Sequence, residues 1–236
     1  TVPSLSLDDI SDKPSTTPSE EREISGVPVI SHKIPTNGIV YAELYFDVTD
    51  IDAEEAPYFA LLSFLLANLQ TKKHTATEVQ RLIKMHLGGF DARLNALTRF
   101  EGEKNLPKIY FQIGASALFG EADNLVKLVS EILNETNFSD DEAIKNILRQ
   151  TVIASEESFA STGHQVAMGR ATAACSVESA CREYYNGYES YLVFKSLDKN
   201  FESEKENIKA TSVYLPYARI CCGVFKLWYQ TISFYN

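Results

Sequence analysis

Alternating hydrophobic and polar residues predict two pairs of strands in the first half of the chain. Gly38 to Val48 places Val, Ala, Leu and Phe on one face and Tyr, Glu, Tyr and Asp on the other, the period of two that a half-buried strand requires. Val27 to Ile34 precedes it, and the Pro-Thr-Asn-Gly sequence between them is a turn signal. A second pair of strands is predicted over Phe90 to Phe100 and Lys108 to Ala117.

Helical periodicity accounts for most of the remaining chain. Helices are expected over Glu54 to Leu69, Thr75 to Leu87, Glu121 to Glu135, Asp140 to Phe159, His164 to Cys175 and beyond, Glu189 to Asn200, and Glu202 to Ala210. Thr75 and Glu78 have the spacing of a capping box, and Gly88 and Gly89 stop that helix. Strand pairs followed by helix pairs predict an α+β fold, with a mostly antiparallel sheet and helices packed on one face.

The chain divides into three segments. Residues 1–22 contain three prolines among Ser, Thr, Asp and Glu, which indicates an extended linker. Residues 23–210 form the predicted α+β domain. Residues 211–236 hold seven aromatic residues and no Asp or Glu. This tail either supplies a buried strand or is not the sequence that the fold requires, as a truncated or altered reading frame would give.

Composition and charge exclude several classes of function. The chain is 44% hydrophobic, which is enough to bury a substantial core, and its net charge of −10 argues against binding nucleic acid. The longest apolar runs, such as Phe59 to Leu69, are shorter than the roughly 20 residues of a membrane span. The cysteines lack metal-site spacing, which suits reduced thiols in a cytoplasm or an organelle matrix. They are Cys175, Cys181, Cys221 and Cys222.

Two stretches resemble the presequence-protease branch of the inverted-zincin metallopeptidases, the pitrilysin and insulin-degrading family. Leu66 to Ala96 reads LANLQTKKHTATEVQRLIKMHLGGFDARLNA, which is similar to the region that follows the zinc helix in that family. Ser161 to Phe201 carries the pattern Gly-His-x-x-Ala-x-x-Arg-Ala at Gly163 to Ala171, which resembles the third domain of presequence-protease-type enzymes. The opening PSLSLDDI is similar to the start of that domain.

The resemblance also locates three positions where the family's chemistry is missing. In the family's catalytic domain, an H-x-x-E-H helix ends six residues before the Thr that corresponds to Thr71, and its two His bind zinc while its Glu is the general base. Counting back from Thr71 places these positions at Leu61, Phe64 and Leu65. Apolar side chains cannot ligate zinc. We therefore expect no catalytic residue and no metal ligand in this chain, and all three side chains buried. Zinc would belong to a separate catalytic domain.

Other polar residues offer weaker candidates. The four histidines are His32, His74, His86 and His164, and no two lie within five residues of each other, so no helical pair of ligands exists. His74 is expected to be solvated in a turn, and His86 to lie near a helix C-terminus. His164 and Arg170 are candidates for contact with a partner or a peptide. Their alternative role is to start and pack a helix.

The resemblance implies a function for the whole domain. It predicts a non-catalytic domain of a zinc metallopeptidase that degrades unstructured peptides, forming wall and interface of a closed peptide chamber. Its partners would be the catalytic half of the peptidase and unstructured peptides, and the chain alone would be inactive. The alternative is a stand-alone scaffold or peptide-binding protein of the same fold. An upstream H-x-x-E-H in the same reading frame would separate the two.

Overall fold

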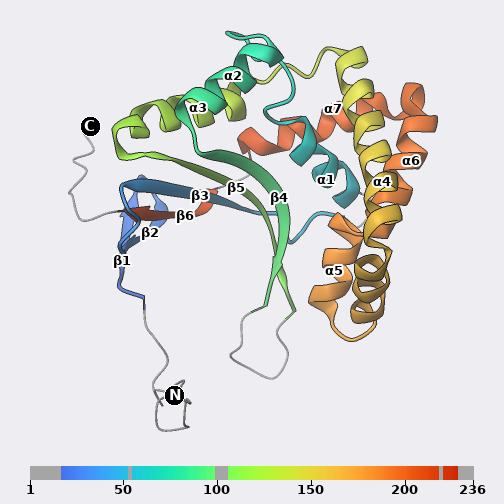
Figure 1. The fold of residues 1–236 in the computed structure, drawn as a ribbon, viewed down its shortest axis with the longest axis horizontal. Coiled ribbons are helices and arrows are strands. Elements are labelled where there is room, and N and C mark those ends of the chain that lie inside the picture. Colours follow the sequence, from blue (N-terminus) through green and yellow to red (C-terminus); the bar gives the residue numbers. More distant parts are fainter. Residues whose placement is uncertain (1–16, 53–54, 99–105, 218–219, 228–236) are drawn as a thin grey trace, which may run out of the picture.

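A computed structural model describes residues 17–52, 55–98, 106–217 and 220–227, with side chains as far as residue 211. Within these residues, six strands form one sheet in the order β1-β2-β6-β3-β5-β4 (Figure 1). The strands are β1 (Ser19–Ile24), β2 (Val27–Lys33), β3 (Ile39–Asp47), β4 (Gly89–Leu97), β5 (Lys108–Leu118) and β6 (Ile220–Leu227). Neighbours are antiparallel except β2 and β6, which are parallel. The predicted α+β fold with a mostly antiparallel sheet is confirmed.

The helices pack on one face of this sheet and on one another. They are α1 (Ala56–Leu65), α2 (Ala76–His86), α3 (Ala122–Glu135), α4 (Asp141–Ala173), α5 (Val177–Asn186), α6 (Tyr188–Lys199) and α7 (Phe201–Tyr217), with a 3-10 turn at Phe119–Glu121. Helices α2 and α3 lie side by side above the sheet, and α4, α5 and α6 form a group at one side of it (Figure 1). Helix α1 contacts β4 on one side and that group on the other.

The register of the sheet separates an apolar face from a polar one. Phe46, Phe111 and Leu94 are paired across β3, β5 and β4, and all three are buried in the core beneath the helices. The neighbouring residues point to the other face. There Gln112 donates to Glu43 at 3.0 Å, so a buried amide on the helix-free face has its hydrogen-bond partner within the sheet.

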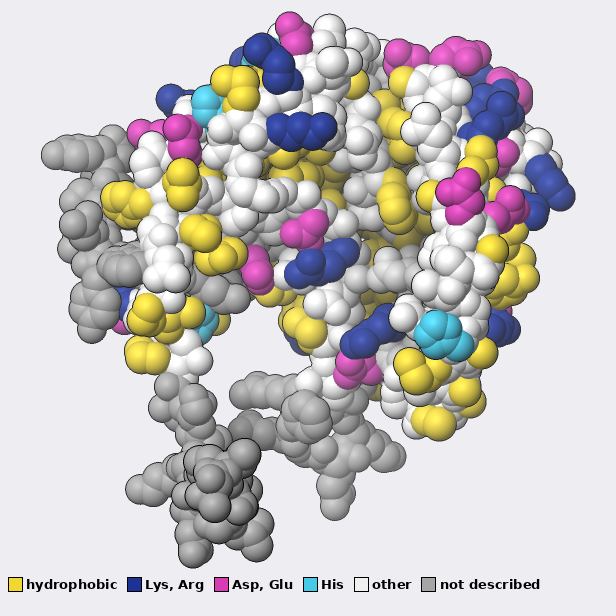
Figure 2. Space-filling model, viewed as in Figure 1, with side chains coloured by type: hydrophobic (Ala, Val, Ile, Leu, Met, Phe, Trp, Pro, Cys, Tyr) yellow, Lys and Arg dark blue, Asp and Glu magenta, His cyan; other side chains and the backbone are white. Residues whose placement is uncertain are grey.

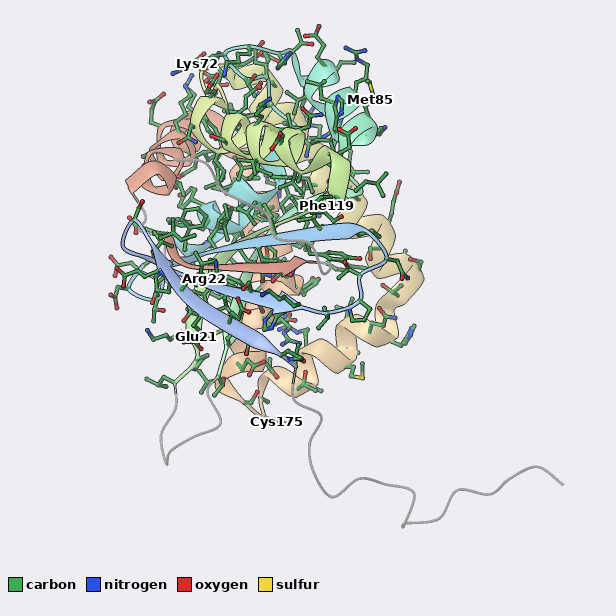
Figure 3. The ribbon with its side chains drawn as sticks, turned by 90° about the vertical axis from the view of Figure 1, so that its left-hand side faces the viewer. Glu21, Arg22, Lys72, Met85, Phe119 and Cys175 are labelled. Carbon is green, nitrogen blue, oxygen red and sulfur yellow. The ribbon has the colours of Figure 1, made fainter. Side chains whose placement is uncertain are left out.

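Strand β1 lies at one edge of the sheet and begins within residues 1–22, which the sequence indicated to be an extended linker. Ser25 and Gly26 have φ angles of 53° and 79°, which are the positive values that a tight hairpin turn between β1 and β2 requires. Glu20 pairs with Lys33 at 2.6 Å across this hairpin. Glu21 and Arg22 lie on the outermost strand (Figure 3). The strand could not be recognised from the sequence, because residues 20–23 are all charged and show no alternation of hydrophobic and polar positions.

Three helices differ from the predicted bounds. Helix α1 ends at Leu65 instead of Leu69, because Ala67 adopts a φ of 64° that no helix tolerates. Helix α4 continues through the expected break and is kinked at Thr162, where φ is −123° and ψ is 30°. Helix α7 extends to Tyr217. Among the helices that the structure describes, none is both long and apolar enough to cross a membrane.

Candidate functional site

Helix α1 carries the three positions that the sequence resemblance aligned with a zinc-binding helix. Leu61 is 0% exposed and Leu65 is 1% exposed. Both belong to the hydrophobic core. An aliphatic side chain has no lone pair to offer a metal, and close packing leaves no room for a metal-bound water. The residues at this position therefore do not fit zinc. In the described part of the chain, no group of three or more His, Cys, Asp or Glu residues could hold a metal ion.

Phe64 corrects the prediction that all three frame residues are buried, because its side chain is 41% exposed. It lies on the same helix as Leu61 and Leu65 but is turned toward α4 and α6 instead of the sheet. Its ring stands edge-on to the ring of Phe194 on α6, with 5.9 Å between centroids. One edge of the aromatic pair is thus packed and the other faces open space.

That space is a groove of about 1010 Å³ enclosed by α1, α2, α4, α5 and α6. Figure 2 shows hydrophobic side chains in the hollowed area between α1 and α4. The lining residues are uncharged at neutral pH. They are Phe64, Asn68, Ala76, Thr77, Gln80, Ala143, Asn146, Ile147, Gln150, Thr151, Ala154, Ser155, Ser158, Phe159, Tyr185, Asn186, Gly187, Ser190, Tyr191 and Phe194. In a chain that is 23% charged, such a surface is unusual.

Side-chain amides hold the rim of the groove in place. Asn68 donates to the backbone oxygen of Phe64 at 2.9 Å, and Gln80 donates to the backbone oxygen of Ala67 at 2.8 Å. The first bond satisfies a carbonyl that the last turn of α1 leaves free, and the second holds the turn that follows the helix. At the opposite end, Asn186 donates to the oxygen of Leu94 on β4 at 3.2 Å. The rim is therefore tied to α1, α2 and the sheet.

The aromatic floor is fixed by packing and by one ion pair outside the groove. The rings of Phe159 and Tyr191 meet edge-on with 5.1 Å between centroids. The Tyr191 hydroxyl donates to Glu156 at 2.8 Å. Lys195 bonds to the same carboxylate at 2.7 Å, and hydrogen bonds from Lys195 and Tyr191 lower the pKa of Glu156. Burial raises the pKa of Tyr185 to about 12, so this lining hydroxyl stays neutral.

A second, smaller cavity of about 440 Å³ lies between α2 and α3 and is lined by charged residues. His74 was expected to be solvated, but its Nδ1 lies 2.7 Å from Glu131 Oε1. Thr71 donates to the same oxygen at 2.5 Å. Burial works to raise the pKa of Glu131, but the bonds from Thr71 and His74 outweigh it and lower the pKa. At the end of α2, His86 is 2.9 Å from Glu121. These contacts join α2 to the elements around α3.

The structure does not bring His164 and Arg170 together. Arg170 pairs with Glu189 at 2.9 Å and with Glu183 at 3.4 Å, and its guanidinium lies 5.1 Å from the centroid of the Tyr188 ring. Arg170 therefore joins α4 to α5 and α6. His164 is exposed, and within the described residues it makes no hydrogen bond or ion pair.

Sequence reasoning did not find the groove. Its signal was present on α4 as four uncharged residues spaced four apart, Asn146, Gln150, Ala154 and Ser158. Residues at this spacing form a stripe on one side of a helix. Stripes of polar uncharged residues are common on solvated helices. Only the aromatic residues that α1 and α6 place opposite this stripe identify it as one wall of a groove.

Comparison with known proteins identifies the family. Residues 1–197 match a family model. The model describes a domain that is associated with peptidases of subfamily C of metallopeptidase family 16. The chain belongs to this peptidase-associated family. This pitrilysin-like membership agrees with the resemblance read from the sequence.

Relatives from plants, bacteria and fungi match most of the chain. Presequence protease 1, chloroplastic/mitochondrial, of Arabidopsis thaliana is 30% identical over 89% of this chain and 19% of its own length. Protein HypA of Clostridium perfringens is 28% identical over 88% of this chain and 21% of its own length. The mitochondrial presequence protease of Kluyveromyces lactis is 28% identical over 77% and 20%. The chain thus spans about a fifth of the length of these relatives.

Proposed function

We propose that this peptidase-associated domain is non-catalytic and forms part of the wall and interface of a closed chamber in which a zinc metallopeptidase degrades unstructured peptides. The chain would be inactive alone. The zinc ion and the residues that ligate it would belong to a separate catalytic half. The observation that carries the proposal is the conversion of the zinc-site frame into core at Leu61 and Leu65.

Aliphatic residues at these positions keep the helix packed on the sheet but cannot take part in zinc catalysis. A helix that packs on the sheet through aliphatic residues can preserve the shape of the catalytic fold without a metal or a general base. Such a domain could affect the rate of peptide cleavage by the catalytic half only indirectly. It could enclose the substrate, limit its freedom and exclude bulk water.

The partners follow from the same proposal. One surface would meet the catalytic half, and the exposed His164 is a candidate contact there. Arg170 is a weaker candidate, because Glu183 and Glu189 already occupy its guanidinium. Relatives named as mitochondrial or chloroplastic proteases support an organelle matrix, with the cytoplasm as the alternative.

Turnover of a quenched fluorescent peptide tests the proposal. The catalytic half, a complete C-terminal half that contains this domain, and the 236-residue chain are assayed separately and mixed. We expect little turnover from the catalytic half alone, none from the chain alone, and restored turnover when the two halves are mixed. Cleavage by the chain alone in the presence of a chelator would contradict the proposal. Full activity of the catalytic half without any partner would also contradict it.

A further inference from the structure

We propose that the groove beside α1 binds an extended peptide segment with uncharged side chains, and that the free carboxamides of Asn146 and Gln150 bond to the main chain of that peptide. This inference rests on the proposed function and names the part of the domain that would hold a substrate peptide.

The groove selects against charge. Its twenty lining residues are uncharged, on a chain with a net charge of −10. A charged group that enters such a groove would lose hydration without gaining a partner. A peptide main chain is neutral and presents donors and acceptors at regular intervals, which the amides and hydroxyls of the walls can satisfy.

The α4 wall has the spacing of an extended main chain. Asn146 and Gln150 are both exposed, and their side chains make no hydrogen bond within the described residues. Residues four apart on a helix are separated by a rise of roughly 6 Å. Alternate residues of an extended chain are roughly 6.7 Å apart and direct their N–H and C=O groups to the same side. A carboxamide carries both a donor and an acceptor, so two of them can pair with two successive same-side residues.

The opposite wall and the floor are suited to apolar side chains. Phe64 offers an aromatic surface that is 41% exposed. The half-buried Phe159 and the largely buried Tyr191 and Phe194 also line the groove. Every second side chain of an extended peptide points in the same direction. We therefore expect a preference for Phe, Leu or similar residues at alternate positions, where each would gain from burial against aromatic rings.

The composition of the lining favours a transient peptide over a permanent protein partner. Ten of the twenty lining residues are Asn, Gln, Ser or Thr. Cores of permanent interfaces are more apolar than this. A volume of about 1010 Å³ lies at the upper end of the roughly 300–1,000 Å³ typical of ligand sites. A short peptide segment therefore suits both the size and the chemistry of the groove.

The test measures peptide binding to the 236-residue chain by fluorescence anisotropy. The probe is a ten-residue peptide with blocked ends and a neutral dye, in which Phe or Leu alternates with Ser or Thr. A second probe carries Glu at the apolar positions. We expect saturable binding of the first probe and at least tenfold weaker binding of the second.

Matched variants locate the binding site. Gln150→Glu changes one lining amide into a carboxylate and should weaken binding of the neutral probe about tenfold, the scale of one lost hydrogen bond and an added buried charge. Phe64→Ala should weaken it by a similar factor. Gln165→Glu makes the same chemical change at an exposed position of α4 outside the groove and should leave affinity unchanged within about twofold.

Three results would overturn the inference. They are equal binding of both probes, equal loss in Gln150→Glu and Gln165→Glu, and a Gln150→Glu variant that weakens association with the catalytic half but not peptide binding. Because binding is measured without catalysis, the two proposals can fail separately. Restored turnover without probe binding would overturn this inference alone. Probe binding in the groove without any restored turnover would overturn the proposed function alone.

Discussion

Two concave regions formed by the helices of this domain have opposite chemistry. The groove beside α1 has an uncharged lining, and two of its amides lack partners within the described residues. The cavity between α2 and α3 is lined in large part by charged and titratable residues, and the Nδ1 of its His74 lies 2.7 Å from Glu131 Oε1. A cluster rich in charge can thus serve to hold helices together. The exposed amides of Asn146 and Gln150 have no partner within the described protein and are free to bond to a ligand.

The largest effect is expected when a carboxylate is placed on the core face of α1, behind the groove. Leu61→Glu should destabilise the fold by about 4 kcal/mol or more, because the carboxylate would be buried among aliphatic side chains without a partner. Phe64→Glu, one turn further along α1, should cost only about 1 kcal/mol, because its side chain is 41% exposed. Urea unfolding of both variants measures the difference. Similar losses would show that Phe64 is not at a surface.

The next test removes the buried carboxylate of the charged region. Glu131→Gln should lower the free energy of unfolding by about 1–3 kcal/mol, because bonds from Thr71 and His74 to a carboxylate are replaced by bonds to a neutral amide. Glu135→Gln is the matched control, since it removes the ion pair with the exposed Lys73. The control should lose less than about 1 kcal/mol. A larger loss in the control would contradict the assignment of Glu131 as the structural carboxylate.

Glu131 of the charged region should contribute to the loss of stability in acid. The folded pKa of Glu131 is lowered from its ordinary value of 4.5, so the unfolded chain binds more protons at acidic pH. The stability that Glu131 contributes is therefore present above pH 4.5 and is lost as pH falls through the folded pKa. In Glu131→Gln, the acid side of the stability profile should be flatter. An unchanged profile would assign the acid sensitivity to other carboxylates.

A free amide in the groove should matter little for stability. Asn146→Asp should change the free energy of unfolding by no more than about 0.5 kcal/mol, because an exposed side chain without partners contributes little to the fold. Thermal unfolding at neutral pH measures this change. A marked loss of stability would show that the amide has a structural role, and would weaken the case for a free binding group.

Local features of the fold could be predicted from sequence because adjacent residues determine them. The capping box is present as expected, since the Thr75 hydroxyl accepts from the Glu78 N–H at 3.3 Å and Glu78 accepts from the Thr75 N–H at 2.9 Å. The apolar face of β3 also lies where its alternation predicted, with Val40, Ala42 and Phe46 buried. Periodicity and capping report on neighbours in the chain, and these elements depend on such neighbours.

The features that could not be predicted from the sequence depend on contacts between segments that are distant along the chain. Nothing near Phe64 in the sequence indicates that Phe194 of α6 will pack against only one edge of its ring. The helical periodicity of α1 is apolar all around, so it could not distinguish the core face at Leu61 from the groove face at Phe64. The buried pair of Thr71 and Glu131 joins residues that are sixty apart. Only the assembled fold determines such pairs.

The order of the strands has a consequence for biosynthesis. Strand β6 lies between β2 and β3, parallel to the first and antiparallel to the second. Among the described strands it alone joins the β1–β2 hairpin to the β3–β5–β4 sheet. A ribosome makes the chain from its N-terminus, so both partial sheets are synthesised before the strand that connects them. Until residues 220–227 emerge, β2 and β3 each expose an unpaired edge. These edges would then be targets for chaperones or for mispairing in the nascent chain.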